Sequence, residues 1–315
     1  MKGIVFKQKY ISYMTGKLFI DNLINTLDDA CVIEYDNKAL DSNDWESIEK
    51  KLKDNKDADF MYIGIDFGLF KNMKPFHELG VPTVITAGNS WERLKNDQWK
   101  KFVYIHKPSI ISLDDWCSKP LYEDYLEGEY EYVWKPFDTN LSVIRDYEED
   151  KVIDISLTGK LSYTDRRYYN SYVNIISIKH KLKYKRFNHN YTFEQYARNL
   201  NKSWMSLSSV QNNPFYKGLY IGANVPKNIE IAGCKTCLFT RKWGDSEKMG
   251  FKDGENCVLF KDNSQIESKL IEYINDKEKL MKISKRGYEL VHEEHTPKKH
   301  IKQYIKDLKE VLRKI

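Results

Sequence analysis

The sequence of 315 residues predicts an α/β protein with two domains, each built on a parallel sheet. Short apolar runs alternate with helical patterns in both halves, with short connections, which is typical of parallel strands joined by right-handed crossovers. The apolar run from Phe60 to Ile65 fits a central parallel strand that is buried on both faces. The chain is also long for one hydrophobic core and natural for two.

In the first half, apolar runs predict strands and apolar residues at helical spacing predict helices. Beside 60–65, strands are expected at Ile4 to Phe6, Cys31 to Tyr35, Val81 to Thr86, Val103 to His106 and Ile110 to Ser112. Helices are expected around Leu18 to Leu27, Trp45 to Leu52 and Phe70 to Leu79. Strand and helix therefore alternate along this half.

A proline-containing segment followed by a charged stretch marks the predicted domain boundary. Pro136 stiffens the segment Val133 to Leu141, and the charged stretch Arg145 to Lys151 suits a solvated linker. We place the boundary at about residue 145, which gives domains 1–145 and 146–296. The last segment, 297–315, reads as a separate helix that begins at Pro297.

The second half repeats the alternation. Strands are expected at Val152 to Leu157, Tyr184 to Phe187 and Trp204 to Leu207, and in the runs CLFT and CVLF. A helix with Phe193, Tyr196 and Ala197 lies between two of them. In the last helix, apolar residues recur at helical spacing and lysines cover the opposite face. That helix suits either packing on the first domain or a peripheral membrane contact.

Composition describes a folded protein, with 41% hydrophobic and 14% aromatic residues. Lys and Arg exceed Asp and Glu by only five, 51 against 46, which permits an anionic ligand without indicating nucleic acid or membrane. No apolar run reaches the length of a spanning helix, and no signal peptide is visible. Five scattered cysteines fit a reducing compartment, so we expect a cytoplasmic protein.

Lys227 and Glu230 are three positions apart and share one face of a helix. An ammonium group suits a phosphate, and a carboxylate suits the vicinal hydroxyls of a ribose. One face that offers both fits a nucleoside diphosphate. Surface Lys–Glu pairs are also common, so the spacing alone leaves both interpretations open.

The surrounding sequence adds a resemblance. The pair lies in the run P-K-N-I-E-I-A-G-C-K-T-C-L-F-T, which F-K-D-G-E-N-C-V-L-F and E-E-H-T-P-K-K-H follow. These motifs resemble those of GT-B glycosyltransferases, particularly the spore-protein YkvP/CgeB-like group. The similarity is good over about the last hundred residues. Lys227 stands where the group usually has Arg, Lys235 where it has Gly, and Gly222 where many retaining relatives have Glu, so retention and inversion both stay open.

The resemblance implies two Rossmann-like domains, a C-terminal helix that packs back on the first, and a nucleotide-sugar donor held by the second. It places Glu230 on the ribose and Lys227 near the diphosphate. The turn Thr158-Gly159-Lys160 would face the same diphosphate, which favours Gly159 and Lys160 over Arg166. Arg166 suits either a phosphate contact or a solvated helix start. Asn188, after a strand, suits either a plain turn or the pyrimidine edge of a UDP-linked donor.

The catalytic group is harder to assign. Asp66 follows the most buried strand and is the best placed carboxylate to act as a base in an inverting reaction, but it also suits a helix N-cap. His106 is a second candidate, with a structural role favoured. Cys234 and Cys237 form a lone C-x-x-C, and the scattered histidines lack ligand spacing, so we expect no metal and no cofactor.

The sequence therefore predicts a metal-independent glycosyltransferase that acts on a glycan or protein acceptor. Three alternatives remain: a glycosyltransferase acting on modified DNA bases, a nucleotide-sugar epimerase, and a non-catalytic nucleotide-sugar-binding protein. Nucleic acid is not favoured as a partner, because the charge surplus is small.

Overall fold

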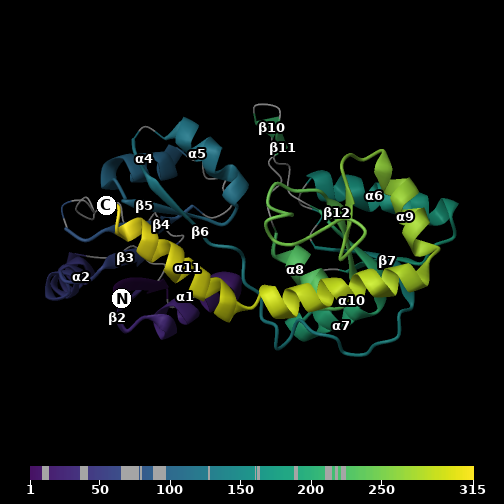
Figure 1. The fold of residues 1–315 in the computed structure, drawn as a ribbon, viewed down its shortest axis with the longest axis horizontal. Coiled ribbons are helices and arrows are strands. Elements are labelled where there is room, and N and C mark those ends of the chain that lie inside the picture. Colours follow the sequence, from purple (N-terminus) through teal and green to yellow (C-terminus); the bar gives the residue numbers. More distant parts are fainter. Residues whose placement is uncertain are drawn as a thin grey trace. The chain divides into compact units, whose positions relative to one another are not determined.

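The computed structural model describes residues 1–8, 14–35, 42–64, 78, 80–87, 97–126, 128–159, 161, 164–187, 191–209, 215–216, 219–220 and 225–315. The chain divides into two compact units (Figure 1). One consists of Met1–Asp138 together with Pro297–Ile315, and the other of Thr139–Thr296. Each unit has a parallel sheet of its own, which confirms the predicted α/β class.

The first unit holds a six-stranded sheet in the order β2-β1-β3-β4-β5-β6, with every pair parallel. The strands are β1 (Lys2–Gln8), β2 (Asp29–Tyr35), β3 (Phe60–Ile63), β4 (Thr83–Thr86), β5 (Ile110–Leu113) and β6 (Glu131–Trp134). The connecting helices are α1 (Met14–Thr26), α2 (Ser42–Asp54), α4 (Asp97–His106) and α5 (Lys119–Tyr125), with a 3₁₀ turn at Trp116–Ser118. Strand β3 is buried along its length, as its apolar sequence predicts.

The prediction of a strand at Val103 to His106 is wrong, because these residues form the end of helix α4. Trp99, Phe102, Val103 and His106 are buried at helical spacing, whereas the intervening Tyr104 and Ile105 are exposed. The apolar run is the visible part of a helical stripe that starts at Trp99. Strand β6, which the sequence did not predict, forms the edge of this sheet. The helix predicted at Phe70 to Leu79 lies outside the described residues, apart from Glu78.

The last helix, α11 (Pro297–Leu312), packs on the first unit, as the fold class predicts. Its stripe of Ile301, Tyr304, Ile305, Leu308 and Val311 enters the core that contains Val5, Phe19 and Tyr62. The Tyr304 ring meets the Phe19 ring edge-on, with centroids 5.0 Å apart. Figure 1 draws α11 in yellow beside α1 in purple. At the start of the helix, buried His300 bonds to buried Asp138 at 2.7 Å.

Truncating Leu308 to alanine should lower the free energy of unfolding by about 2–5 kcal/mol, because its side chain is fully buried and leaves a cavity. Urea unfolding measures the change. Lys309→Ala is the matched control, since the neighbouring Lys309 is exposed. A loss for Leu308→Ala no larger than for the control would contradict the packing of α11 described above.

The second unit holds a five-stranded parallel sheet in the order β13-β12-β9-β7-β8. The strands are β7 (Ile153–Thr158), β8 (Tyr184–Phe187), β9 (Ser203–Ser208), β12 (Cys237–Arg241) and β13 (Val258–Phe260). The helices are α6 (Thr164–Lys179), α7 (Phe193–Asn201), α8 (Pro226–Gly233), α9 (Gln265–Ile274) and α10 (Lys277–Glu294). A small antiparallel pair, β10 (Phe215–Tyr216) and β11 (Leu219–Tyr220), is separate.

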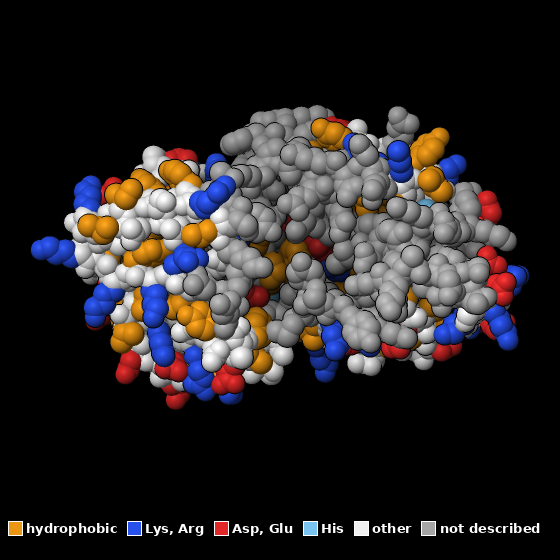
Figure 2. Space-filling view, turned by 180° about the vertical axis from the view of Figure 1, so that it is seen from behind, with side chains coloured by type: hydrophobic (Ala, Val, Ile, Leu, Met, Phe, Trp, Pro, Cys, Tyr) orange, Lys and Arg blue, Asp and Glu red, His pale blue; other side chains and the backbone are white. Residues whose placement is uncertain are grey.

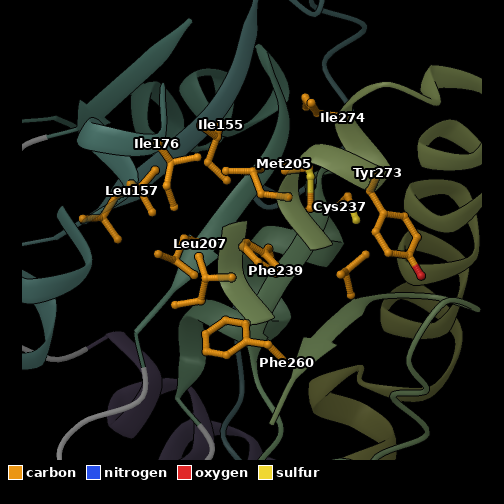
Figure 3. Close-up of a cluster of buried hydrophobic side chains, with 14 of the residues drawn as sticks. Ile155, Leu157, Ile176, Met205, Leu207, Cys237, Phe239, Phe260, Tyr273 and Ile274 are labelled. Atoms are coloured by element: carbon orange, nitrogen blue, oxygen red, sulfur yellow. The ribbon is translucent and has the colours of Figure 1, made fainter. Parts of the chain in front are cut away.

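Figure 3 shows a cluster of buried hydrophobic side chains in this unit. Strand residues Leu207, Phe239 and Phe260 pack together, with the Phe239 and Phe260 rings 5.1 Å apart. Alternate residues of the central strands are apolar and fully buried, which fixes the register of the sheet. The carboxyl ends of these strands are thereby held at defined positions.

The units divide between Asp138 and Thr139, ahead of the boundary that we predicted near residue 145. The reason is that Ile144 is fully buried in the second unit: a Cβ built on Gly233 would lie 2.7 Å from its Cγ2. The stretch Arg145 to Lys151 is also better anchored than the solvated linker we expected. Lys151 donates to the carbonyls of Ser203 and Lys235 at 2.9 Å, and burial lowers the pKa of its ammonium to about 8.

Candidate functional site

The connections of the second sheet create a topological switch point. From β7 the chain passes to β8 on one side and then returns to β9 on the other. In open α/β sheets, ligands bind outside the carboxyl ends of the strands at such a point. Here the two adjacent ends are Thr158 of β7 and Ser208 of β9. Side chains gathered at this edge are the candidates for a ligand site.

Gly159, directly after β7, lies at the centre of this edge. Its φ of +111° is a conformation that side chains rarely allow. A Cβ at Gly159 would come within 2.6 Å of both the Arg166 Nη1 and the Lys227 Nζ. Its own amide donates to the Phe187 carbonyl at 3.3 Å. Gly159 therefore contributes mainly the room that lets two cationic groups approach the backbone.

Arg166 enters the site from the first turn of α6. The side chain is 6% exposed, and its Nε donates to the Oγ of Ser209, just beyond β9, at 3.0 Å. The guanidinium thus bridges the switch point from β7 to β9. Because its side chain is buried, Arg166 is not the solvated helix start that was one of its two interpretations. The adjacent Arg167 is exposed.

Lys227 enters from the first turn of α8, which Pro226 opens. Because its Nζ and the Arg166 Nη1 lie within 2.6 Å of one point, they are separated by no more than about 5 Å. Two unit charges at that distance repel by about 3 kcal/mol at an effective dielectric constant of 20. The N-terminus of α6 adds partial positive charge at the same edge. This arrangement of positive charge can bind an anion.

Glu230 lies one turn after Lys227 on α8 and is 9% exposed. Its Oε2 accepts a hydrogen bond from the Tyr196 hydroxyl at 2.9 Å. Burial raises the pKa of the Glu230 carboxyl above its ordinary value, whereas the Lys227 charge and the Tyr196 hydrogen bond lower it. Fully buried Ile229 and Ile231 fix the helix on both sides of the carboxylate. The carboxylate is therefore held in place on α8, one turn after Lys227.

The sequence predicted four candidate site residues that the structure describes: Lys227, Glu230, Gly159 and Arg166. In the structure they lie together at one edge of the second sheet. Tyr196 was expected only as a residue of a helix. The helical spacing of Tyr196 with Phe193 and Ala197 predicts that it lies on a helix. That spacing does not predict a contact with Glu230, which lies 34 residues later in the sequence.

Other predicted positions lie outside the described residues. They are the diphosphate candidate Lys160, the base-contact candidate Asn188, the catalytic candidate Asp66 and the motif position Gly222. The second catalytic candidate, His106, lies at the end of α4 and is 1% exposed. Its ring packs against the Phe102 ring, with the two ring centroids 4.5 Å apart. It therefore has the structural role that the sequence favoured.

The C-x-x-C cysteines, Cys234 and Cys237, are fully buried, and burial raises the pKa of both thiols. Among the described residues, no group of three or more His, Cys, Asp or Glu side chains is arranged to hold a metal ion. Over the same part of the chain, no helix is long and apolar enough to cross a membrane.

A family model described as glycosyl transferase-like matches residues 144–306. No curated protein sequence matches the chain significantly. Similar solved structures include HepE of Anabaena in complex with UDP and glucose, with a TM-score of 0.64, 10% identity, and 98% of this chain and 100% of that chain covered.

Two further structures have the same architecture. Sucrose-phosphate synthase from Thermosynechococcus elongatus has a TM-score of 0.62 and 9% identity, with both chains covered completely. A TarM variant from S. aureus in complex with Fondaparinux, alpha-GlcNAc-glycerol and UDP has a TM-score of 0.61 and 13% identity, with 85% of this chain and 57% of that chain covered. At these identities the likeness establishes the fold, which is that of GT-B glycosyltransferases.

Proposed function

The chain belongs to the glycosyl transferase-like family, and from that premise we propose that it transfers a sugar from a UDP-linked donor to an acceptor hydroxyl. The observation that carries the proposal is the convergence of Arg166, Lys227 and Glu230 at the switch point of the second sheet. Two cations beside a glycine turn suit the diphosphate, and the buried carboxylate suits the ribose. UDP is the proposed nucleotide because HepE, which has a similar fold, forms complexes with UDP and with UDP-glucose.

In the proposed reaction, the bond from the anomeric carbon to the diphosphate breaks and negative charge develops on the leaving oxygens. Lys227, Arg166 and the N-terminus of α6 stabilise that charge, since fixed cations and dipoles act where charge grows. Glu230 orients the nucleotide through its ribose hydroxyls. Lys160 and Asn188 are further proposed contacts, to the diphosphate and to the base.

The acceptor must lose a proton as its oxygen attacks. For an inverting reaction we propose Asp66 as the base, since it follows the buried strand β3 by three residues in the sequence. We propose a glycan or a protein as the acceptor, and the cytoplasm as the compartment, because five scattered cysteines fit a reducing environment. The complex of TarM with a glycan, Fondaparinux, supports the glycan. The finer similarity to the YkvP/CgeB-like group stays a prediction.

Nucleic acid is the acceptor of the main alternative. On the face drawn in Figure 2, the described acidic and basic side chains are interspersed, in keeping with a surplus of only five positive charges. A protein with several phosphate contacts loses duplex affinity on the order of a thousandfold between 50 and 200 mM salt. Tight DNA binding with that salt dependence would favour a DNA-base glycosyltransferase.

Activity should not require a divalent metal ion, because Lys227 and Arg166 already supply two charges for the diphosphate. A panel of UDP-sugars, with release of free UDP as the readout, identifies the donor and separates an enzyme from a binding protein. With the best donor, the rate in EDTA is expected to stay within about twofold of the untreated rate. A rate that collapses in EDTA and returns with Mg²⁺ or Mn²⁺ would contradict metal independence.

A further inference from the structure

The Tyr196 hydroxyl donates a hydrogen bond to one of the two oxygens of the Glu230 carboxylate. Tyr196 is the only hydrogen-bond partner of this carboxylate within the described part of the chain, and it occupies Oε2 alone. A carboxylate accepts hydrogen bonds at both of its oxygens. Oε1 is thus the oxygen that remains for a ligand, and its direction depends on what holds Oε2.

Tyr196 is itself firmly placed. It lies in the first turn of α7, which a capping box secures: Thr192 accepts from the Gln195 amide, and the Gln195 side chain accepts from the Thr192 amide. The Tyr196 ring stacks on that of Phe193 with centroids 6.0 Å apart. At the other end of α7, buried Asn201 bonds to the Arg145 carbonyl at 2.9 Å. A helix fixed at both ends holds the hydroxyl against Glu230.

We propose that Tyr196 is a positioning residue of the donor site, whose hydroxyl fixes one oxygen of Glu230 so that the other meets the ribose hydroxyls. The inference rests on the proposed function and adds to it a determinant of the nucleotide class. A carboxylate fixed in this way accepts from the 2′- and 3′-hydroxyls together. Ribonucleotides are therefore preferred over 2′-deoxyribonucleotides, and the preference depends on Tyr196.

The same hydrogen bond sets the pH range of binding. Burial and the Glu230 charge raise the pKa of Tyr196 far above its ordinary value, so its hydroxyl stays a donor. Burial raises the pKa of Glu230, whereas the Lys227 charge and the bond from Tyr196 lower it. Only the ionised carboxylate accepts from two hydroxyls, so affinity falls as the pH drops through that pKa. Without the Tyr196 hydroxyl, the pKa of Glu230 rises further and the fall begins at a higher pH.

The test is calorimetric titration of UDP and 2′-deoxy-UDP into wild type and Tyr196→Phe at pH 8, 7, 6 and 5. We expect Tyr196→Phe to bind UDP about tenfold more weakly at pH 7, with a smaller loss for 2′-deoxy-UDP. The acidic decline of UDP affinity should also start at a higher pH in the variant. Tyr184→Phe is the matched control, because the Tyr184 hydroxyl bonds to Asn170 at 2.8 Å elsewhere in the same unit.

The outcomes separate the two proposals. Wild type that binds neither UDP nor 2′-deoxy-UDP overturns the proposed function and this inference with it. If wild type binds UDP and Tyr196→Phe matches it in affinity, nucleotide preference and pH profile, the inference alone fails. Equal losses for UDP and 2′-deoxy-UDP with an unchanged pH profile also overturn it, since that pattern marks a general structural role.

Discussion

Replacing Glu230 by alanine is expected to weaken UDP binding by about ten- to a hundredfold. The variant loses a charge-assisted hydrogen bond to the ribose, and such a bond contributes about 1.5–3 kcal/mol. Lys227→Ala should cause a loss of the same size through the diphosphate, and one that shrinks as salt is added. Calorimetric titration at pH 7.5 measures both.

Lys235→Ala is the control for Lys227→Ala. Lys235 lies just after the same helix, but its Nζ pairs with Asp146 at 2.7 Å, and the side chain is 45% exposed. Its removal should leave UDP affinity within about twofold of wild type. If Glu230→Ala and Lys227→Ala are folded and bind UDP as wild type does, the switch-point site is not the nucleotide site.

Gly159→Ala is expected to reduce UDP affinity more than either charge removal, by a hundredfold or more, and to lower the stability of the second unit. A residue with a side chain at this φ costs about 1–3 kcal/mol of backbone strain. The new Cβ would also displace both the Arg166 guanidinium and the Lys227 ammonium, since each lies 2.6 Å from its position. Thermal unfolding and UDP titration report the two effects separately.

Gly80→Ala is the control that measures the cost of backbone strain alone. Gly80 also has a positive φ, +70°, but a Cβ there meets nothing within 4 Å. That variant should lose stability while UDP affinity stays at the wild-type level. UDP binding by Gly159→Ala at wild-type strength would mean that the two cations do not hold the diphosphate.

Local patterns in the sequence were sufficient for most of the fold and part of the site. Apolar runs located β3 and β7, and the three-residue spacing placed Lys227 and Glu230 on one helical face. The strand predicted at Val103 to His106 failed because four residues are too few to distinguish a strand from the end of a helix. The periodicity became visible only with Trp99 included.

The rest of the site depends on contacts between distant residues. Arg166 meets Ser209 across 43 positions, and Tyr196 meets Glu230 across 34. Such pairs form because the sheet order β9-β7-β8 brings α6, α7 and α8 to one edge. No periodicity within a single helix encodes that order, so the burial of Arg166 and the role of Tyr196 required the three-dimensional structure.

The position of α11 has a consequence for synthesis on the ribosome. The core around Phe19 and Tyr62 needs Tyr304 and Leu308, so the first unit to emerge is the last to be completed. At about 5–20 residues per second, the intervening residues 139–296 take on the order of 10 to 30 s to make. Throughout that time the apolar surface that α11 later covers stays open to chaperones and proteases. Limited proteolysis of a chain that ends at residue 296 and has been released from the ribosome should therefore cut the first unit while the contiguous second unit resists.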